Sequence, residues 1–253
     1  MQRIVLIAAC LLGASSVARA QDWRPYVFSL DGLTLNAKRA ALEAGAGYNG
    51  VTGAGGGLQP DDARRTTAWV SAAVGLTDRV ELSGAFLFGD DPTNGAGFNQ
   101  ARIDLRVRLL NPRKRFPVAI SAGAGYQADA LIEHAITANL AATAFIGRVN
   151  LTVNVRAAHY FHTGRDPVDV FVTAGALVRA TNWLRVGAEY VGEELEGVFG
   201  ADLDDAIGGR HYVGPTAALF FVDNKLRLNA TAGPVFTQAQ TGMLARASLA
   251  YLF

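Results

Sequence analysis

Apolar and polar side chains alternate along most of the chain. Between residues 101 and 109 one set of alternate positions is apolar (Ile103, Leu105, Val107 and Leu109), and the other is charged (Arg102, Asp104, Arg106 and Arg108). Successive side chains of a β-strand point to opposite faces, so this stretch is typical of a strand with one apolar and one charged face. The same period of two recurs in residues 149–157, 184–190 and 226–231. Such strands need apolar surroundings on one side and water on the other.

About twelve segments of this kind follow one another, and single-chain membrane barrels use an even number of strands. We therefore predict an all-β fold, a single antiparallel up-and-down transmembrane β-barrel that occupies residues 38–253. The competing fold is a soluble β-sandwich, which also alternates along its strands but hides its apolar faces in one shared core. The expected strands lie near residues 38–48, 65–76, 79–89, 100–110, 116–127, 131–146, 149–162, 167–179, 183–193, 210–221, 225–236 and 243–253.

The connections between these segments alternate in length, which favours the barrel. Tight connections are expected at residues 77–79, 147–148, 181–182 and 223–225, with a slightly longer one at 111–115. The intervening connections include residues 49–64, 89–99 and 193–209, all rich in Gly and Asp. Short periplasmic turns that alternate with longer external loops are the expected asymmetry of an outer-membrane barrel. This arrangement places both ends of the barrel domain in the periplasm.

Residues 1–20 have the pattern of a cleaved signal peptide. Arg3 precedes an apolar stretch, and small residues close on Ala18-Arg19-Ala20, so we expect export and a mature chain that starts at Gln21. The alternative is a lipoprotein signal in which Cys10, the single Cys of the chain, is lipidated. Residues 21–37 then form a periplasmic N-terminal segment, long enough to fold up into the barrel as a partial plug.

The composition argues against a membrane protein with spanning helices and against a nucleic-acid-binding protein. After residue 20 no apolar stretch approaches the roughly 20 residues that a membrane-spanning helix needs. The whole chain carries 23 basic and 22 acidic side chains, with no basic block among them. This balance gives no electrostatic footprint for nucleic acid, so we expect no nucleic-acid partner.

The end of the chain resembles a known targeting signal. Leu249, Tyr251 and Phe253 lie on one face of the last alternating segment. This pattern resembles the C-terminal signal by which Gram-negative bacteria recognise outer-membrane β-barrels for insertion. Residues 74–82 are likewise similar to hairpins of outer-membrane transporter and porin-like barrels. The resemblance implies a bacterial outer-membrane location, reached through the periplasm, with the barrel-assembly machinery, outer-membrane lipid and lipopolysaccharide as partners.

Charged residues at the inward positions predict a wet, charged lumen. A barrel of twelve strands is wider than one of about eight, whose interior side chains can fill. We expect the lumen to be lined by Arg102, Asp104, Arg106, Arg108, Arg156, Arg185, Glu189, Arg227, Arg246, Glu43 and Glu81. The hypothesis that follows is a channel for passive or weakly selective diffusion of small solutes. The alternative is that these charges pair and fill the interior, which gives a non-conducting structural or surface-interaction barrel.

The third and remote alternative is that the protein is an enzyme, a surface lipid hydrolase. His134 and His159 are expected to face outward on neighbouring strands, yet no Ser and no carboxylate lie beside them to complete a hydrolytic site. We therefore expect these residues to belong to an aromatic girdle. We predict no enzymatic activity, no catalytic residue, no cofactor and no dedicated metal site. Acidic loop residues such as Asp90 and Asp202 are expected to be solvated, with divalent-cation bridging to lipopolysaccharide as the alternative.

Overall fold

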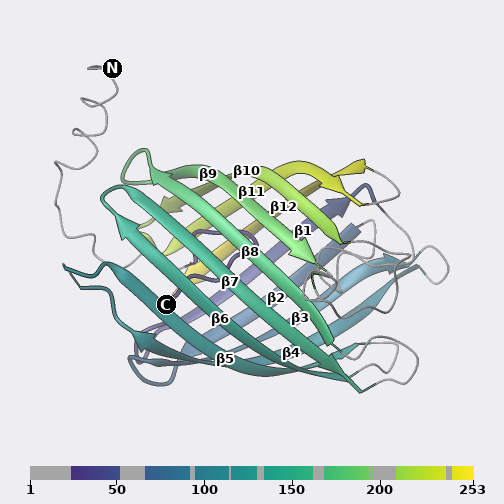
Figure 1. Cartoon of the computed structure of the whole chain (residues 1–253), viewed down its shortest axis with the longest axis horizontal. Coiled ribbons are helices and arrows are strands. Elements are labelled where there is room, and N and C mark those ends of the chain that lie inside the picture. Colours follow the sequence, from purple (N-terminus) through teal and green to yellow (C-terminus); the bar gives the residue numbers. More distant parts are fainter. Residues whose placement is uncertain are drawn as a thin grey trace.

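The computed structural model describes residues 24–51, 66–91, 95–113, 115–129, 134–161, 168–193, 195, 209–237 and 241–253. Within these ranges the chain forms twelve β-strands in one closed barrel (Figure 1). The strands are β1 Ala40–Asn49, β2 Thr66–Gly75, β3 Val80–Asp91, β4 Gly95–Leu110, β5 Val118–Asp129, β6 His134–Ile146, β7 Val149–Tyr160, β8 Val168–Arg179, β9 Leu184–Glu193, β10 Arg210–Phe221, β11 Leu226–Phe236 and β12 Thr241–Leu252. The predicted signal peptide lies outside the described residues.

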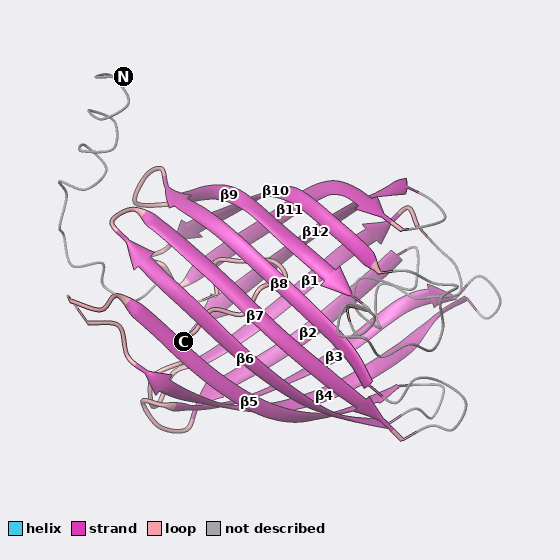
Figure 2. Cartoon of the chain, in the orientation of Figure 1, coloured by secondary structure: helices cyan, strands magenta, loops and turns pink. Residues whose placement is uncertain are grey.

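Each strand pairs antiparallel with its neighbours in the sequence, and the last strand closes the ring on the first. In this closing pair Ala41 lies opposite Leu252 and Asn49 lies opposite Leu244. Closure leaves no strand edge unpaired, which membrane barrels require. The prediction of an all-β, twelve-stranded antiparallel barrel is confirmed, and the alternative of two packed sheets is wrong. Figure 2 shows the strands tilted across the barrel. No helix in the described ranges is long and apolar enough to cross a membrane.

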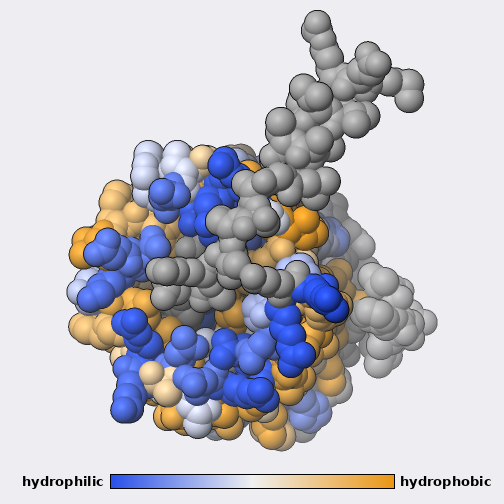
Figure 3. Space-filling view, turned by 90° about the vertical axis from the view of Figure 1, so that its left-hand side faces the viewer, coloured by the Kyte–Doolittle hydropathy of each residue, from blue (hydrophilic) through white to orange (hydrophobic). Residues whose placement is uncertain are grey.

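Side-chain exposure separates the two faces of each strand. On β4, Ile103 and Leu105 are 51% and 45% exposed, whereas Arg106 is 1% exposed. Because the apolar side is the exposed one, the wall presents an apolar belt to its surroundings and keeps its polar side inside. Figure 3 looks onto the end with the tight turns, where hydrophilic side chains gather and apolar ones frame them.

The hairpin between β3 and β4 is longer than the sequence indicated. We expected residues 89–99 to form a loop, but β3 continues to Asp91 and β4 starts at Gly95. Leu87 lies opposite Gln100 and Phe88 lies opposite Phe98, so β4 carries one extra residue here. This β-bulge breaks the period of two, because Phe98 is exposed while Gln100 is buried. The alternation therefore stops at the bulge although the strand does not.

Residues 24–39, which we call the N-terminal segment, precede β1. Residues 24–35 of this segment lie inside the ring of strands, and residues 36–39 lead out to the start of β1. Figure 1 shows this purple trace folded within the barrel before β1 begins. Tyr26, Phe28 and Leu33 are buried although they belong to no strand. The segment contacts side chains from both sides of the ring, such as Glu81 of β3 and Glu189 of β9. The interior of the barrel is thus partly filled by chain that is not part of its wall.

Candidate functional site

Glu189 is the main anchor of the N-terminal segment. Its carboxylate, 1% exposed on the inner face of β9, accepts hydrogen bonds from the backbone N–H groups of Val27, Phe28 and Ser29 at 2.9, 3.0 and 3.0 Å. The hydroxyl of Thr216 donates a further bond to it at 3.0 Å. Consecutive backbone amides form a concave site for an anion, and bonds to a charged acceptor are stronger than neutral ones. This cluster fixes the middle of the segment.

Glu81 of β3 joins the two ends of the same segment. One carboxylate oxygen forms an ion pair with the guanidinium of Arg24. The other accepts a hydrogen bond from the backbone N–H of Leu35 at 2.8 Å. Glu81 is 0% exposed, so the ion pair has little competition from water. The chain between Arg24 and Leu35 is consequently held as a loop against the wall.

Arg106 of β4 binds the segment through its carbonyl groups. Its guanidinium donates to the carbonyl oxygens of Asp31, at 3.2 Å, and of Leu33, and lies 3.9 Å from the Asp31 carboxylate. Arg106 pairs with Gly123 of β5, where an added Cβ would lie 2.8 Å from the Arg106 Cγ. Glycine on the neighbouring strand therefore leaves the space in which the long side chain lies.

Asp31 is the buried acid of the N-terminal segment itself. Its carboxylate accepts hydrogen bonds from the backbone N–H groups of Arg24 at 2.9 Å and Leu33 at 3.2 Å. Burial raises the pKa of Asp31 above its ordinary value of 3.8, against the opposing attraction of the Arg106 and Arg24 guanidinium groups. The docked segment therefore holds a proton on Asp31 more tightly than the same segment in water.

Aromatic side chains pack the segment against the wall. The Tyr26 hydroxyl donates to the Asn150 carbonyl at 2.9 Å, and the ring centroid of Phe28 lies 5.2 Å from that of Tyr212. The Arg246 guanidinium carbon lies 4.9 Å from the Phe28 centroid and 4.2 Å from the Trp69 centroid. Cation–π contacts of this kind attract the guanidinium to both rings.

The remaining inward charges that the sequence indicated are engaged within the barrel. Arg227 forms an ion pair with Glu43 at 2.7 Å, and Arg102 forms one with Asp104 at 2.9 Å. Among their contacts, Arg156 donates to the Gln127 side chain at 2.9 Å, Arg185 donates to the Thr181 carbonyl at 2.8 Å, and Arg108 donates to the Asp78 carbonyl. All the expected lumen-lining residues are buried or half-buried. They do not form one cluster, because they are spread around the ring and from the tight turns to the middle of the strands.

Two cavities flank the N-terminal segment. One, of about 140 Å³, is lined by Phe28 of the segment and by Trp69, Leu87 and Arg246 of the wall among others. We call it the external cavity because Trp69 and Leu87 lie in the halves of β2 and β3 next to the long loops. The other, also about 140 Å³, is lined by Leu35, Arg108 and residues of the tight turn at 223–225. Residues 28–33 lie between the two cavities.

Sequence reasoning missed several residues of this interior. Trp69 was available from the alternation, because it shares the inward set of β2 with Thr67 and Ala73, all of which are buried. Arg24 and Asp31 had no such signal, since neither belongs to a strand. Their place depends on the path of the segment through the lumen.

The histidines face outward and contact aromatic side chains. His134 Nδ1 lies 2.5 Å from the Tyr126 hydroxyl, and the rings are stacked with centroids 5.7 Å apart. His159 packs edge-to-face on Phe161 at 5.5 Å. Such contacts are typical of an interfacial aromatic girdle. Among the residues that the structure describes, no group of three or more His, Cys, Asp or Glu side chains could hold a metal ion.

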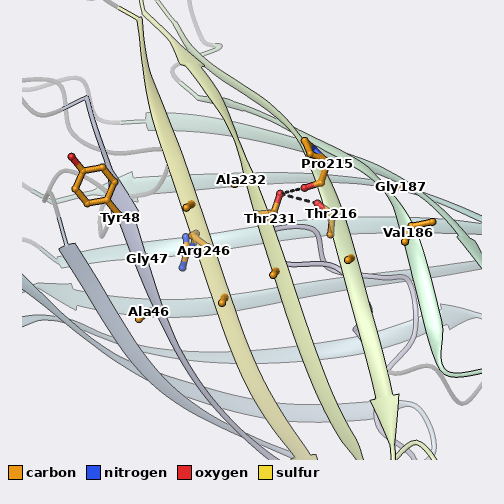
Figure 4. A pocket seen from close by; sticks show the side chains of 14 residues that line it. Ala46, Gly47, Tyr48, Val186, Gly187, Pro215, Thr216, Thr231, Ala232 and Arg246 are labelled. Atoms are coloured by element: carbon orange, nitrogen blue, oxygen red, sulfur yellow. Dashed lines mark hydrogen bonds between the residues drawn. The ribbon is translucent and has the colours of Figure 1, made fainter.

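The outer wall is hollowed where small side chains cluster on neighbouring strands. Figure 4 shows this hollow of about 680 Å³, with Tyr48 of β1 and Val186 of β9 at its ends. Between them the exposed positions are alanines and Pro215, and the Thr231 hydroxyl donates inward of them to the Pro215 carbonyl at 2.8 Å. Since the exposed lining is almost wholly apolar, lipid chains would fill this hollow in a membrane.

Comparison with known proteins identifies the fold. No protein-family model matches the sequence, and no curated protein matches it significantly. Among solved structures, an outer membrane channel from Pseudomonas putida F1 is similar with a TM-score of 0.60 and 14% identity, over 90% of this chain and 100% of that one. The KdgM porin, in complex with disordered oligogalacturonate, is similar with a TM-score of 0.54 and 9% identity, over 83% of this chain and 98% of that one. The chain therefore has the porin-like β-barrel fold of outer-membrane channels.

Proposed function

We propose that this chain is a channel of the bacterial outer membrane for passive or weakly selective diffusion of small solutes, closed at rest by its N-terminal segment. The observation that carries the proposal is that the polar interior holds a segment bound by side-chain contacts and joined covalently to the wall only at β1. Release of this segment breaks no strand pairing of the barrel. A twelve-stranded wall without the segment leaves an aqueous passage, because its radius exceeds what interior side chains fill at about eight strands.

Export and assembly complete the proposal. Residues 1–20 direct export and are removed, and the barrel-assembly machinery recognises the last strand. The side chains of Leu249, Tyr251 and Phe253 support this role, since they are exposed on the outer face at 50%, 38% and 55%. In the membrane these side chains contact lipid, and the external loops lie near lipopolysaccharide. We propose no catalytic activity, because the histidines of the outer wall are bonded to or packed on aromatic rings.

A non-conducting structural barrel is the second candidate, and the density of interior contacts favours it. Glu81, Glu189 and Arg106 each make at least two hydrogen bonds to the segment. If these bonds never break, the segment is a permanent filling of the barrel. The two candidates therefore differ in one property, which is whether the segment leaves the lumen.

Conductance in a planar lipid bilayer tests this difference. The refolded chain is compared with a variant that lacks residues 24–34, which keeps the backbone bonds of Lys38 and Arg39 at the start of β1. If the chain is a channel, we expect rare or brief conductance steps for the complete chain and long-lived ohmic steps for the deletion variant. A folded deletion variant, verified by its heat-dependent mobility in gels, that passes no current overturns the channel. A further variant, Arg106→Ala, should lengthen the open periods of the complete chain.

A further inference from the structure

We infer that the external cavity is a binding site for small organic anions that carry one flat apolar ring, with benzoate as the simplest member of the class. The inference rests on the proposed channel only for the route by which a solute arrives. Binding itself needs the folded barrel with its N-terminal segment in place. The occupant is defined by three properties of the cavity, which are its charge, its aromatic and polar lining, and its volume.

The charge of the lining is positive. Four guanidinium groups (Arg24, Arg102, Arg156 and Arg246) face two carboxylates (Glu43 and Asp104), which leaves two formal positive charges. The ion-pair partners behind the lining, Glu81 and Arg227, contribute one charge of each sign. Glu189, whose carboxylate bonds to the backbone of the lining residues Val27, Phe28 and Ser29, reduces the excess to one positive charge. Both lining carboxylates already lie within 2.9 Å of an arginine nitrogen. An anion that enters the cavity is therefore attracted, and a cation is repelled, more strongly than in bulk water.

The aromatic part of the lining suits a flat ring. Trp69 and Phe28 both line the cavity, and the Arg246 guanidinium carbon lies 4.2 and 4.9 Å from their ring centroids. The N–H groups of a guanidinium lie in its own plane, so contact of its face with a ring leaves them able to bind a carboxylate. Tyr26 of the N-terminal segment and Phe171, on the opposite side of the barrel, add two further rings to the lining. An aromatic carboxylate matches both features at once.

Two polar atoms in the lining point to an occupant independently of the charges. Thr173 is 5% exposed and Asn139 is 8% exposed, and both line the cavity. The Thr173 hydroxyl and the Asn139 side-chain oxygen have no hydrogen-bond partner among the described residues. Buried polar groups are normally satisfied by protein, water or ligand. The hydroxyl of Thr173 can donate to a carboxylate, whereas the Asn139 oxygen only accepts and therefore needs a donor, such as water or a hydroxyl substituent on the ring.

The volume limits the size of the occupant. The external cavity measures about 140 Å³. An apolar cavity of about 150 Å³ in a protein interior is known to hold one benzene molecule. A single ring with a carboxylate therefore fits if the carboxylate extends toward the arginines. Larger solutes would require displacement of the N-terminal segment.

Equilibrium dialysis of the complete refolded chain in detergent tests the site without any need for conduction. The probes are benzoate, its neutral isostere benzamide, the cation benzylamine and the ringless anion acetate. We expect benzoate to bind at least tenfold more tightly than each of the other three. Equal binding of benzoate and benzamide, or no saturable binding of benzoate, overturns the inference.

Matched variants locate the binding. Arg246→Gln removes one charge from the cavity and should weaken benzoate binding at least tenfold. Arg185→Gln makes the same change near a tight turn, outside the cavity lining, and should leave binding unchanged. Thr173→Val removes only a hydroxyl and should weaken binding about threefold to tenfold, which keeps the test open if Arg246→Gln does not fold. An equal loss in Arg246→Gln and Arg185→Gln contradicts the proposed place.

The outcome is separable from that of the channel proposal. Benzoate binding without current in the deletion variant supports the site and overturns the channel. Current in the deletion variant without benzoate binding to the complete chain supports the channel and overturns the site.

Discussion

The carboxylate of Glu189 lies against the backbone amide of Phe28, and the neighbouring amides of Val27 and Ser29 bond to the same group. One inward side chain of the wall thus satisfies three backbone N–H donors of a buried segment that pairs with no strand. The position of the N-terminal segment depends on this contact more than on any regular secondary structure.

Glu189→Gln should release the segment more often. The variant keeps the size of the side chain but replaces a charged acceptor with one neutral acceptor oxygen. If the docking free energy of the segment falls by about 2 kcal/mol, the ratio of closed to open states falls roughly 30-fold. Single-channel recordings measure this ratio directly. Glu193→Gln is the matched control, because Glu193 lies on the same strand and pairs with Arg210 at 3.9 Å. Unchanged gating in Glu189→Gln contradicts the role of this anchor.

Gly175→Val should have a similar effect through steric exclusion. Gly175 lies beneath Tyr26, and a Cβ at this position would lie 2.5 Å from the Tyr26 Cε1 atom. Valine is favourable in a strand, so the wall should tolerate it while Tyr26 must move. We expect longer open periods in bilayer recordings and increased protease cleavage within residues 24–35. Ala176→Val places the same side chain on the exposed face of β8 and should behave as the original chain. Resistance of Gly175→Val to protease, equal to that control, would argue against this packing.

The pH dependence of gating follows from Asp31. Burial raises the pKa of Asp31, so the docked segment binds a proton more strongly than the released one. Docking therefore gains stability as the pH falls through the raised pKa and loses it as the pH rises, with no further gain below the ordinary value of 3.8. The open fraction should decrease as the pH is lowered from neutral toward about 4. Asp31→Asn should lack this component, and identical pH profiles for the two proteins would refute the assignment.

Removal of Phe253 should separate targeting from stability. Its backbone N–H bonds to the Ala40 carbonyl at 2.8 Å, and its ring packs on Tyr251 with centroids 4.8 Å apart. These contacts lie at one corner of the wall, so refolding in detergent should change little. In cells the amount inserted in the outer membrane should fall several-fold, because the assembly machinery loses its recognition residue. The refolding yield in detergent and the amount inserted in the outer membrane are both measured. Equal losses of the two would mean that Phe253 contributes only to stability.

The sequence by itself determined the wall of this protein. A strand has a fixed period of two, so Ile103 and Arg106 could be assigned to opposite faces without any knowledge of their neighbours. The same rule places Trp69 and Arg246 on the inner face. It failed at the bulge opposite Leu87 and Phe88, where one extra residue reverses the alternation and only the paired strand reveals it.

Only the tertiary structure decided what fills the barrel. The N-terminal segment has no periodicity to read, because its contacts go to different strands around the ring rather than to one face. Arg246, Trp69 and Phe28 come from three distant parts of the chain. They meet only because closure brings β12 beside β1 and β2, and because the N-terminal segment lies against the inner face of the wall there. Local alternation is fixed by backbone geometry, whereas such contacts depend on how the closed ring places side chains across its interior.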